Sequence, residues 1–466
     1  MRKSMKMSKY NFIACDSENN LVVYNFLYGL KSLTKIMKKD AGKFRLLFLT
    51  DNEISAETCD MHTEVVDTLR KAGILVDADV DENILYDAKI YDEVYNNKLT
   101  LTIFPTGKCN FRCPYCFETP QHFSREDMTV EAQNALLKFV QKEIPNHKAL
   151  RVAWFGGEPL VAPDIIKRLS NQFIKICDIR HIPYYAEMTT NGYLLNPDMF
   201  DMLYKFKVYQ YMITIDGFKE QHDKQRFTLE GKGSYDVIIN NLLRIRDSKQ
   251  YKFARIRIRI NMSNNFLKIL DDFVYHLASL FADDPRFEFM FVPVVKFSGS
   301  DYSNSNLCND NSEFFKRLFN NNVYKNKLCP ENVFLNAIVR QPSCYAATKN
   351  SYVITPDLKV HKCNSHYDFD VNKIGNIDLK GNLSIDEAIH RRWYLTKRLI
   401  HKVPKSCIDC YYMPCCVVFD SGCPTSYLRA NPEEISCPLK NEKQEKQIID
   451  TVLYAADKYP CIVISL

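Results

Sequence analysis

The chain has 466 residues, of which 46% are hydrophobic and 25% charged, a balance typical of a globular protein with two or three domains. Lys and Arg total 62 against 56 Asp and Glu, so the net charge of +6 gives no field that favours nucleic-acid binding. There is no apolar signal core near Met1 and no run of 18 apolar residues, so we expect a cytoplasmic protein without membrane partners.

Residues 1–95 predict a small α+β domain. The segments YNFIAC and NLVVYNF are typical of a β-hairpin around the turn DSENN. The segment TEVVDTLRKAGILVD is typical of a helix followed by a strand. Elements of this size fit a winged-helix-like domain. The simplest role for such a domain is that of a cap over the open side of a neighbouring domain.

Three cysteines, Cys109, Cys113 and Cys116, follow the apolar run LTLTIFP in the segment GKCNFRCPYCFE. A [4Fe-4S] cluster takes four ligands, usually thiolates, so this spacing leaves one iron open to a small chelating molecule. The 17 cysteines of the chain, an odd number in an expected reducing compartment, favour metal ligands over disulfides. Zinc is the alternative, but it prefers four ligands in C-x2-C pairs, and the nearest imidazole, His122, lies outside the usual spacing.

From residue 99 onward, β-rich apolar runs alternate with segments of helical periodicity, as in repeated βα units. Amphipathic helices are expected in TVEAQNALLKFVQKEI and PDIIKRLSNQFIKIC. Six units predict a partial (β/α)6 barrel, an α/β fold in which chemistry gathers at the carboxyl ends of the strands. The six predicted strands cover residues 100–105, 149–155, 184–190, 208–216, 253–262 and 286–294.

Polar residues and glycines follow several of these strands and outline a site for a zwitterionic, nucleoside-like ligand. The glycines of GGEP allow close approach of the backbone, and Glu158 is suited to accept a hydrogen bond from an ammonium group. Each signal alone is typical of a turn, but together they predict a binding site. Its candidate residues are Gly156, Gly157, Glu158, Pro159, Thr190, Asn191, Asp216, Arg259 and Asn261.

A second array of cysteines occupies the C-terminal part of the chain. Eight ligands would serve two four-iron clusters, and Cys407 and Cys410 have the spacing of two thiolates on one metal centre. A metal that only stabilises a small loop-rich domain is the alternative. The polar stretch 298–328 is the expected linker before this domain. The cysteines of the array are Cys329, Cys344, Cys363, Cys407, Cys410, Cys415, Cys416, Cys423 and Cys437.

The loop CNFRCPYC with GGEP downstream resembles the radical S-adenosylmethionine (radical SAM) enzymes over residues 99–295. The resemblance implies that the three loop cysteines hold a [4Fe-4S] cluster whose open iron binds the amine and carboxylate of S-adenosylmethionine (SAM). Reductive cleavage of SAM gives a 5'-deoxyadenosyl radical, which abstracts hydrogen from the substrate. The implied cofactor contacts are Glu158 and its glycines to the amine, Asn191 to the ribose or carboxylate, Tyr115 or Phe117 near the adenine, and Arg259 to the carboxylate.

The C-terminal array resembles the SPASM extension of radical SAM enzymes that modify peptides. Cys344 and Cys363 bracket the hairpin-like SYVITPDLKVHKC. The spacing C-x6-C after Cys416 and Leu358 in place of a hairpin glycine depart from the pattern. The implied ligands are Cys344, Cys363, Cys423 and, as a possible fourth, Cys329 for one auxiliary cluster, and Cys407, Cys410, Cys416 and Cys437 for the other. Cys415 is an alternate ligand, a free thiol or an active-site residue.

Together the resemblances imply a peptide maturase with an N-terminal domain (1–95), a radical SAM barrel (96–297), the linker and a SPASM domain with a C-terminal helix (329–466). Its cofactors would be SAM and three [4Fe-4S] clusters. Its partners would be an electron donor such as flavodoxin or ferredoxin and a precursor peptide, whose leader adds a strand to the N-terminal domain. The leading product is a thioether between a cysteine sulfur and a carbon, with a carbon-carbon cross-link or epimerisation as alternatives.

Two other functions stay open. Anaerobic sulfatase maturation, which makes formylglycine, uses an Asp base directly after the second hairpin cysteine. This chain has Asn364 there, and a neutral amide cannot take a proton, although Asp368 could substitute. The other alternative is a non-enzymatic iron-sulfur electron carrier or redox sensor, which would need neither GGEP nor a three-cysteine site.

Overall fold

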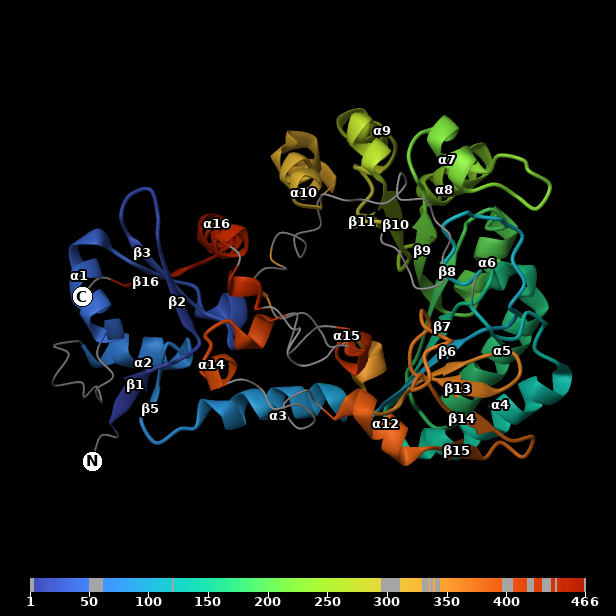
Figure 1. Ribbon diagram of the computed structural model, residues 1–466, viewed down its shortest axis with the longest axis horizontal. Coiled ribbons are helices and arrows are strands. Elements are labelled where there is room, and N and C mark those ends of the chain that lie inside the picture. Colours follow the sequence, from blue (N-terminus) through green and yellow to red (C-terminus); the bar gives the residue numbers. More distant parts are fainter. Residues whose placement is uncertain are drawn as a thin grey trace. The chain divides into compact units, whose positions relative to one another are not determined.

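The computed structural model describes residues 4–49, 62–119, 121–294, 311–328, 335, 338–339, 344–395, 405–416, 423–429, 437–440 and 442–464, and Figure 1 shows the course of the chain. The chain forms two compact units. Unit 1 contains Met1–Asn96, Glu331–Lys349 and Arg391–Leu466, and unit 2 contains Asn97–Pro330 and Asn350–His390. Within the described ranges, no helix is both long and apolar enough to cross a membrane.

Six parallel strands form the centre of unit 2, as the alternating βα pattern predicts. Their order in the sheet is β11-β10-β9-β8-β7-β6, so strands adjacent in sequence are adjacent in space. This confirms the partial barrel. The strands are β6 (Lys98–Ile103), β7 (Ala149–Trp154), β8 (Tyr184–Thr190), β9 (Val208–Thr214), β10 (Arg255–Met262) and β11 (Phe287–Pro293).

Helices cover this sheet, and Figure 1 shows α4, α5 and α6 along its outer side. The predicted amphipathic helices form as α4, which begins where the Thr129 hydroxyl accepts from the Ala132 N–H, and α5. Their apolar faces are buried against the strands. The loops that lead from each strand to the following helix lie at the carboxyl ends of the strands. The helices of this layer are α4 (Val130–Glu143), α5 (Pro163–Ile179), α6 (Pro197–Lys205), α7 (Lys219–Gln225), α8 (Tyr235–Asp247) and α9 (Leu270–Phe281).

The sheet of unit 2 continues beyond β6 with four strands from later in the chain. The strand β12 (Ser351–Ile354) pairs in parallel with β6, and β13 (Lys359–His361), β14 (Lys373–Ile377) and β15 (Leu383–Ile385) follow in antiparallel order. The expected hairpin in SYVITPDLKVHKC is β12 and β13. Leu358, which lies in the turn of this hairpin, adopts φ +62. The turn therefore has the positive φ that favours glycine, although a leucine stands there.

Unit 1 contains a four-stranded sheet in the order β16-β4-β3-β2 and a separate pair, β1 (Met5–Met7) with β5 (Leu75–Asp77). The expected hairpin forms as β2 (Asn11–Cys15) and β3 (Leu21–Asn25), and the expected helix and strand form as α2 (Thr63–Lys71) and β5. The remaining strands and longer helices of unit 1 are β4 (Thr34–Ile36), β16 (Ile462–Ile464), α1 (Lys38–Leu49), α3 (Glu82–Val94) and α16 (Glu442–Lys458).

The C-terminal part is divided differently from the expected continuous domain 329–466. Residues 350–390 join unit 2 because β12 pairs with β6, whereas 331–349 and 391–466 join unit 1. Part of the expected linker 298–328 is helical, since α10 covers Asn311–Asn320 and a π-helical turn covers Tyr324–Leu328. The remaining short helices are α12 (Glu387–Tyr394), α14 (Lys405–Ile408) and α15 (Pro424–Arg429).

Candidate active site

The turn after β7 packs against the cysteine loop through its two glycines. Gly156 has φ +123, and a Cβ on it would lie 2.5 Å from the Thr106 carbonyl oxygen. A Cβ on Gly157 would lie 2.3 Å from the Lys108 carbonyl oxygen, which accepts a hydrogen bond from the Glu158 N–H at 2.8 Å. The glycines of GGEP therefore allow this turn to approach the cysteine loop itself.

The Glu158 carboxylate is 1% exposed and joins the ends of two strands. Its Oε1 accepts from the Leu160 N–H at 3.0 Å and from the Thr190 hydroxyl at 2.7 Å, and its Oε2 accepts from the Asn191 N–H at 2.7 Å. Burial raises the pKa of Glu158, although these hydrogen bonds oppose the shift. Three of its about four acceptor positions are occupied, which leaves one for a ligand.

Asn191 connects the end of β8 to the cysteine loop. Its Nδ2 donates to Asn110 Oδ1 at 2.7 Å, and its Oδ1 accepts from the Tyr193 N–H at 2.9 Å. The structure thus brings the predicted residues Glu158, Thr190 and Asn191 into one cluster beside the loop. Pro159 follows as the first residue of a buried 3-10 turn. The Phe117 carbonyl accepts from Gln121 Nε2 at 2.6 Å, so Phe117 lies in the turn that follows the cysteine loop.

The segment between β9 and α8 fastens the cysteine loop through a second set of backbone contacts. The Arg112 N–H donates to the Phe227 carbonyl at 3.0 Å, and the Leu229 N–H donates to the Asn110 carbonyl at 2.9 Å. These contacts join residues more than a hundred positions apart in the sequence. The shape of the loop is therefore set by hydrogen bonds within the protein.

The three thiols of the loop lie within electrostatic range of one another. Burial and the charge of Glu158 raise the pKa of Cys109 to about 12, with smaller contributions from Cys113 and Cys116. Burial also raises the pKa of Cys113 to about 11, while the Arg226 guanidinium opposes the shift. Thiolates in such surroundings need a positive partner, and a metal supplies one.

Three thiols of this kind fit a four-iron cluster by their chemistry. Each thiolate of such a cluster binds a different iron atom, so its sulfur ligands stand farther apart than the ligands of a single ion. In the part of the chain that the structure describes, no three His, Cys, Asp or Glu side chains are grouped as ligands of one metal ion.

A network of polar side chains connects the loop to the ends of β9 and β10. The Tyr115 hydroxyl donates to the Asp216 carboxylate and accepts from Arg226 Nη1 at 2.7 Å. The Asn261 N–H donates to Asp216 Oδ1 at 3.0 Å, and Arg259 Nε donates to Asn261 Oδ1 at 2.8 Å. Four residues that the sequence predicts for the site thus meet, and Arg226 joins them.

Arg226 and His222 are functional candidates that sequence reasoning missed. Arg226 is 8% exposed, with its guanidinium 4.0 Å from the Asp216 carboxylate and 5.8 Å from the centroid of the Phe111 ring. His222 Nδ1 accepts from the Asp216 N–H at 3.2 Å, and burial, with Arg226 nearby, lowers the pKa of His222 to about 3. The two residues are four apart, six and ten positions after Asp216, and this helical spacing was the available signal.

A cavity of about 290 Å³ lies beside this network. Its lining combines the predicted residues Tyr115, Asp216 and Asn261 with Lys224 and the apolar Phe266. A small cavity with an apolar wall and several placed polar groups suits part of a nucleoside-like ligand.

Glu118 is a further buried acid that the sequence analysis passed over. It is 4% exposed, and its Oε1 has no hydrogen-bond partner among the described residues. Burial raises the pKa of Glu118 to about 8; the Arg125 guanidinium opposes this shift, and the charge of Glu158 adds to it. The residue follows the last loop cysteine, Cys116, by only two positions.

Three of the four thiols expected for the second auxiliary cluster lie within electrostatic range of one another in unit 1. Burial and the charge of Cys437 raise the pKa of Cys407. Burial, the charge of Cys437 and that of Cys407 act in the same way on the pKa of Cys410. Cys407 lies in α14 and Cys410 two residues beyond it. The fourth expected ligand, Cys416, is buried.

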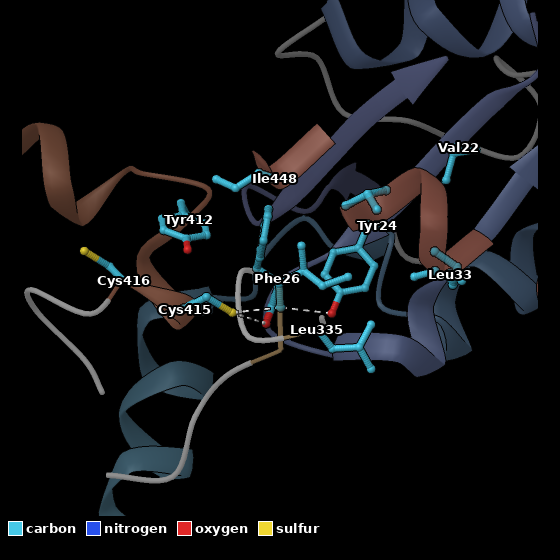
Figure 2. Packing of buried hydrophobic residues seen from close by; sticks show 12 residues of the cluster. Val22, Tyr24, Phe26, Leu33, Leu335, Tyr412, Cys415, Cys416 and Ile448 are labelled. Atoms are coloured by element: carbon cyan, nitrogen blue, oxygen red, sulfur yellow. Dashed lines mark hydrogen bonds between the residues drawn. The ribbon is translucent and has the colours of Figure 1, made fainter. Parts of the chain in front are cut away.

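Cys415 lies in an apolar cluster of unit 1. Its thiol donates to the Ile338 carbonyl at 3.0 Å, and the Tyr24 hydroxyl donates to the same oxygen at 3.0 Å. Figure 2 shows the side chains of Cys415 and Cys416 pointing in opposite directions. Cys415 is 3% exposed, a placement typical of a core thiol, and this placement does not support the expected catalytic role.

The cysteines expected for the first auxiliary cluster are distributed over both units. Cys344 and Cys423 belong to unit 1, Cys363 belongs to unit 2, and Cys329 lies outside the described residues. The Cys363 Sγ accepts from the Ser365 N–H at 3.4 Å. The assignment of these four cysteines to one cluster stays a prediction.

Residues 103–258 match the family model of the radical SAM superfamily. The chain carries a radical SAM domain. The matched span runs from the end of β6 into β10, so it contains the three loop cysteines, GGEP and the network around Asp216.

Curated proteins similar to this radical SAM domain include two named enzymes. The radical SAM cyclopropyl synthase TigE of Paramaledivibacter caminithermalis is 27% identical over 271 residues, 48% of this chain and 55% of that protein. The cysteine-type anaerobic sulfatase-maturating enzyme of Clostridium novyi is 33% identical over 149 residues, 31% of this chain and 39% of that protein. The chain therefore spans about half the length, or less, of these relatives.

Solved structures confirm the radical SAM fold. The structure of anSMEcpe with bound AdoMet has a TM-score of 0.58 and 18% identity, covering 78% of this chain and 96% of that chain. The structure of anSMEcpe with bound AdoMet and Cp18Cys peptide has a TM-score of 0.55 and 19% identity, covering 78% and 99%.

Proposed function

We propose that this protein is a radical SAM peptide maturase. It cleaves SAM reductively and removes hydrogen from a residue of a precursor peptide, and the product is a thioether between a cysteine sulfur and a carbon. The observation that carries the proposal is the meeting, within unit 2, of the three-cysteine loop with the buried acceptor Glu158. An electron carrier or redox sensor would need no such acceptor beside an incompletely ligated cluster.

The residues of the site have complementary roles in this proposal. A [4Fe-4S] cluster held by the three loop cysteines supplies the electron and an open iron. Glu158 offers its remaining acceptor position to the SAM amine. Arg259, as the resemblance implies, and the buried Arg226 are the guanidinium groups suited to the SAM carboxylate. The cavity beside Asp216 accommodates the adenosine part, whose hydroxyl groups match its polar lining.

A peptide substrate is supported by two observations. The second group of thiols, Cys407, Cys410 and Cys437, adds a place for an auxiliary cluster that a simple SAM-cleaving site does not need. A structure with the same fold holds a peptide named Cp18Cys together with AdoMet. We further propose that a leader segment adds to the edge strand β2 of unit 1, since an edge strand carries unpaired backbone groups. Flavodoxin or ferredoxin would supply the electrons.

Formylglycine formation is the second candidate, because a curated relative is named as a sulfatase-maturating enzyme. Asn364 occupies the position of the base that this reaction uses. The substitute acid, Asp368, already accepts from the His122 N–H at 2.9 Å and lies 3.1 Å from its Nδ1. These contacts already engage the Asp368 carboxylate, so the thioether product is favoured.

The experiment is anaerobic incubation of the iron- and sulfide-reconstituted protein with SAM and dithionite, with 5'-deoxyadenosine measured. The wild type should form it, Cys113→Ala should not, and Cys15→Ala, which changes an exposed thiol of unit 1, should form it normally. A wild-type protein that contains iron yet forms none would overturn the proposal. With a candidate peptide, mass spectrometry separates the products: a cross-link loses two hydrogens, formylglycine formed from cysteine exchanges sulfur for oxygen and also loses two hydrogens, and an epimer keeps its mass.

A further inference from the structure

Glu118 is a buried acceptor that lacks a donor. Its side chain is 4% exposed, and no described residue donates a hydrogen bond to its Oε1. An acceptor buried without a donor costs free energy, and nearly all buried polar groups in proteins have a partner. A free acceptor next to a binding site therefore indicates a ligand group that completes it.

The neighbouring cation, Arg125, does not supply this donor. Its Nη2 donates to the Glu118 main-chain carbonyl at 2.5 Å and to the Gln121 carbonyl at 3.1 Å. The guanidinium also lies 4.1 Å from the centroid of the Phe123 ring. These contacts hold Arg125 on the main chain of the loop, so it affects the Glu118 carboxylate through space.

A series of contacts through Arg125 and Gly107 links the main chain of Glu118 to the GGEP turn that carries Glu158. A Cβ on Gly107 would lie 2.7 Å from Arg125 Cα, so the main chain of Arg125 packs against this glycine. A Cβ on Gly157 would lie 2.7 Å from the Gly107 carbonyl oxygen, so the GGEP turn packs there too. The charge of Glu158 accordingly acts on Glu118.

The two acids differ in what they still lack. Glu158 has three donors, whereas Oε1 of Glu118 has none among the described residues. An ammonium group carries three N–H donors and a positive charge, which is the chemistry that two neighbouring carboxylates require. We propose that Glu118 is a second acceptor, beside Glu158, for the ammonium group of bound SAM. This inference rests on the proposed function and names a specificity residue for its site.

The test measures SAM affinity in addition to turnover. Wild type and Glu118→Gln, both reconstituted and shown to hold equal iron, are titrated with SAM by equilibrium dialysis. The electron paramagnetic resonance spectrum of the reduced cluster is followed in parallel. Glu118→Gln should bind SAM about tenfold more weakly, because the amide still offers an acceptor oxygen but cannot carry the negative charge that pairs with the ammonium. Glu143→Gln is the matched control, since Glu143 is a part-buried acid at the end of α4.

A SAM analogue that lacks the amine distinguishes recognition of the ammonium from general packing. It should bind wild type and Glu118→Gln equally. Glu118→Asp, which keeps the carboxyl group, should recover part of the affinity for SAM. Equal loss of affinity for both ligands would overturn the proposal, and so would loss of iron from a folded Glu118→Gln.

Two further results separate this inference from the proposed function. If wild type binds SAM and forms 5'-deoxyadenosine while Glu118→Gln behaves as wild type, only the role of Glu118 is overturned. If Glu118→Gln binds SAM normally but fails to bind a peptide that carries a lysine ammonium, Glu118 serves the peptide and the SAM assignment is overturned. If wild type neither binds nor cleaves SAM, the proposed function itself fails.

Discussion

The two groups of cysteines are held by different means. In unit 2 the loop with Cys109, Cys113 and Cys116 is fastened by backbone hydrogen bonds from the GGEP turn and from the segment before α8. In unit 1 Cys407 lies in a helix of four residues, and a 3-10 turn of three residues ends at Cys415. Backbone contacts at the ends of a parallel sheet therefore help to set the shape of the first loop. We infer that short isolated turns take more of their order from the metal.

The largest expected effect is that of Gly157→Ala, which tests the fastening of the first loop. The new Cβ would lie 2.3 Å from the Lys108 carbonyl oxygen, a backbone atom that cannot move without displacing the loop. We expect a loss of stability of about 3 kcal/mol or more, and failure to retain the SAM-binding cluster. Thermal unfolding and iron analysis measure the two effects.

Gly231→Ala is the matched control in the same unit. Gly231 has φ +76, but a Cβ there would meet nothing within 4 Å. The cost should be only about 1 to 2 kcal/mol, with iron unchanged. If Gly157→Ala behaves like Gly231→Ala, the close packing of GGEP on the loop is not what holds the cysteines.

The next effect tests whether unit 1 depends on metal. Cys437→Ser should remove about four iron atoms per chain, because Cys437 lies within electrostatic range of both Cys407 and Cys410. Local order around α14 should then fall, with faster hydrogen exchange there and unchanged exchange around β6 and β7. Equal protection of α14 in wild type and variant would show that both regions are shaped by the protein alone.

Sequence patterns predicted those features of the protein that depend on residues close together in the chain. The six barrel strands follow from apolar alternation, and Glu158 follows from its place after a strand. Arg226 was not predicted, because its contact with Tyr115 joins residues 111 positions apart. The same reason explains the addition of β12 to β6, which no periodicity indicates and which divides the expected C-terminal domain.

A smaller effect concerns pH and the network that supports the first loop. Burial, with the nearby Arg226, lowers the pKa of His222 to about 3, so below pH 6.5 the unfolded chain binds a proton that the folded chain does not. The stability contributed by neutral His222 is present above pH 6.5 and is lost as the pH falls toward 3. Between pH 6.5 and pH 5 we expect a loss of roughly 2 kcal/mol, measured by denaturant unfolding.

His222→Asn separates this titration from other acid effects. The amide oxygen replaces Nδ1 as acceptor for the Asp216 N–H but takes no proton in this range. The variant should be less stable at pH 7, because the contact with Ser234 is lost, and its stability should fall less between pH 6.5 and pH 5. An equally steep fall would mean that another group controls the acid response of the barrel.

The smallest effect distinguishes two neighbouring thiols of unit 1. Cys415→Ala should lower stability by about 1 kcal/mol and leave the iron content unchanged, because its thiol contacts the Ile338 carbonyl inside an apolar cluster. Cys416→Ala should lose iron, since its side chain points the other way (Figure 2). If iron is lost from Cys415→Ala and kept by Cys416→Ala, Cys415 is the ligand. In that case the Cys415 thiol turns from the Ile338 carbonyl toward the metal when the metal binds. The cysteine region of unit 1 would then depend even more on metal, and less on its own packing, than the cysteine loop of unit 2.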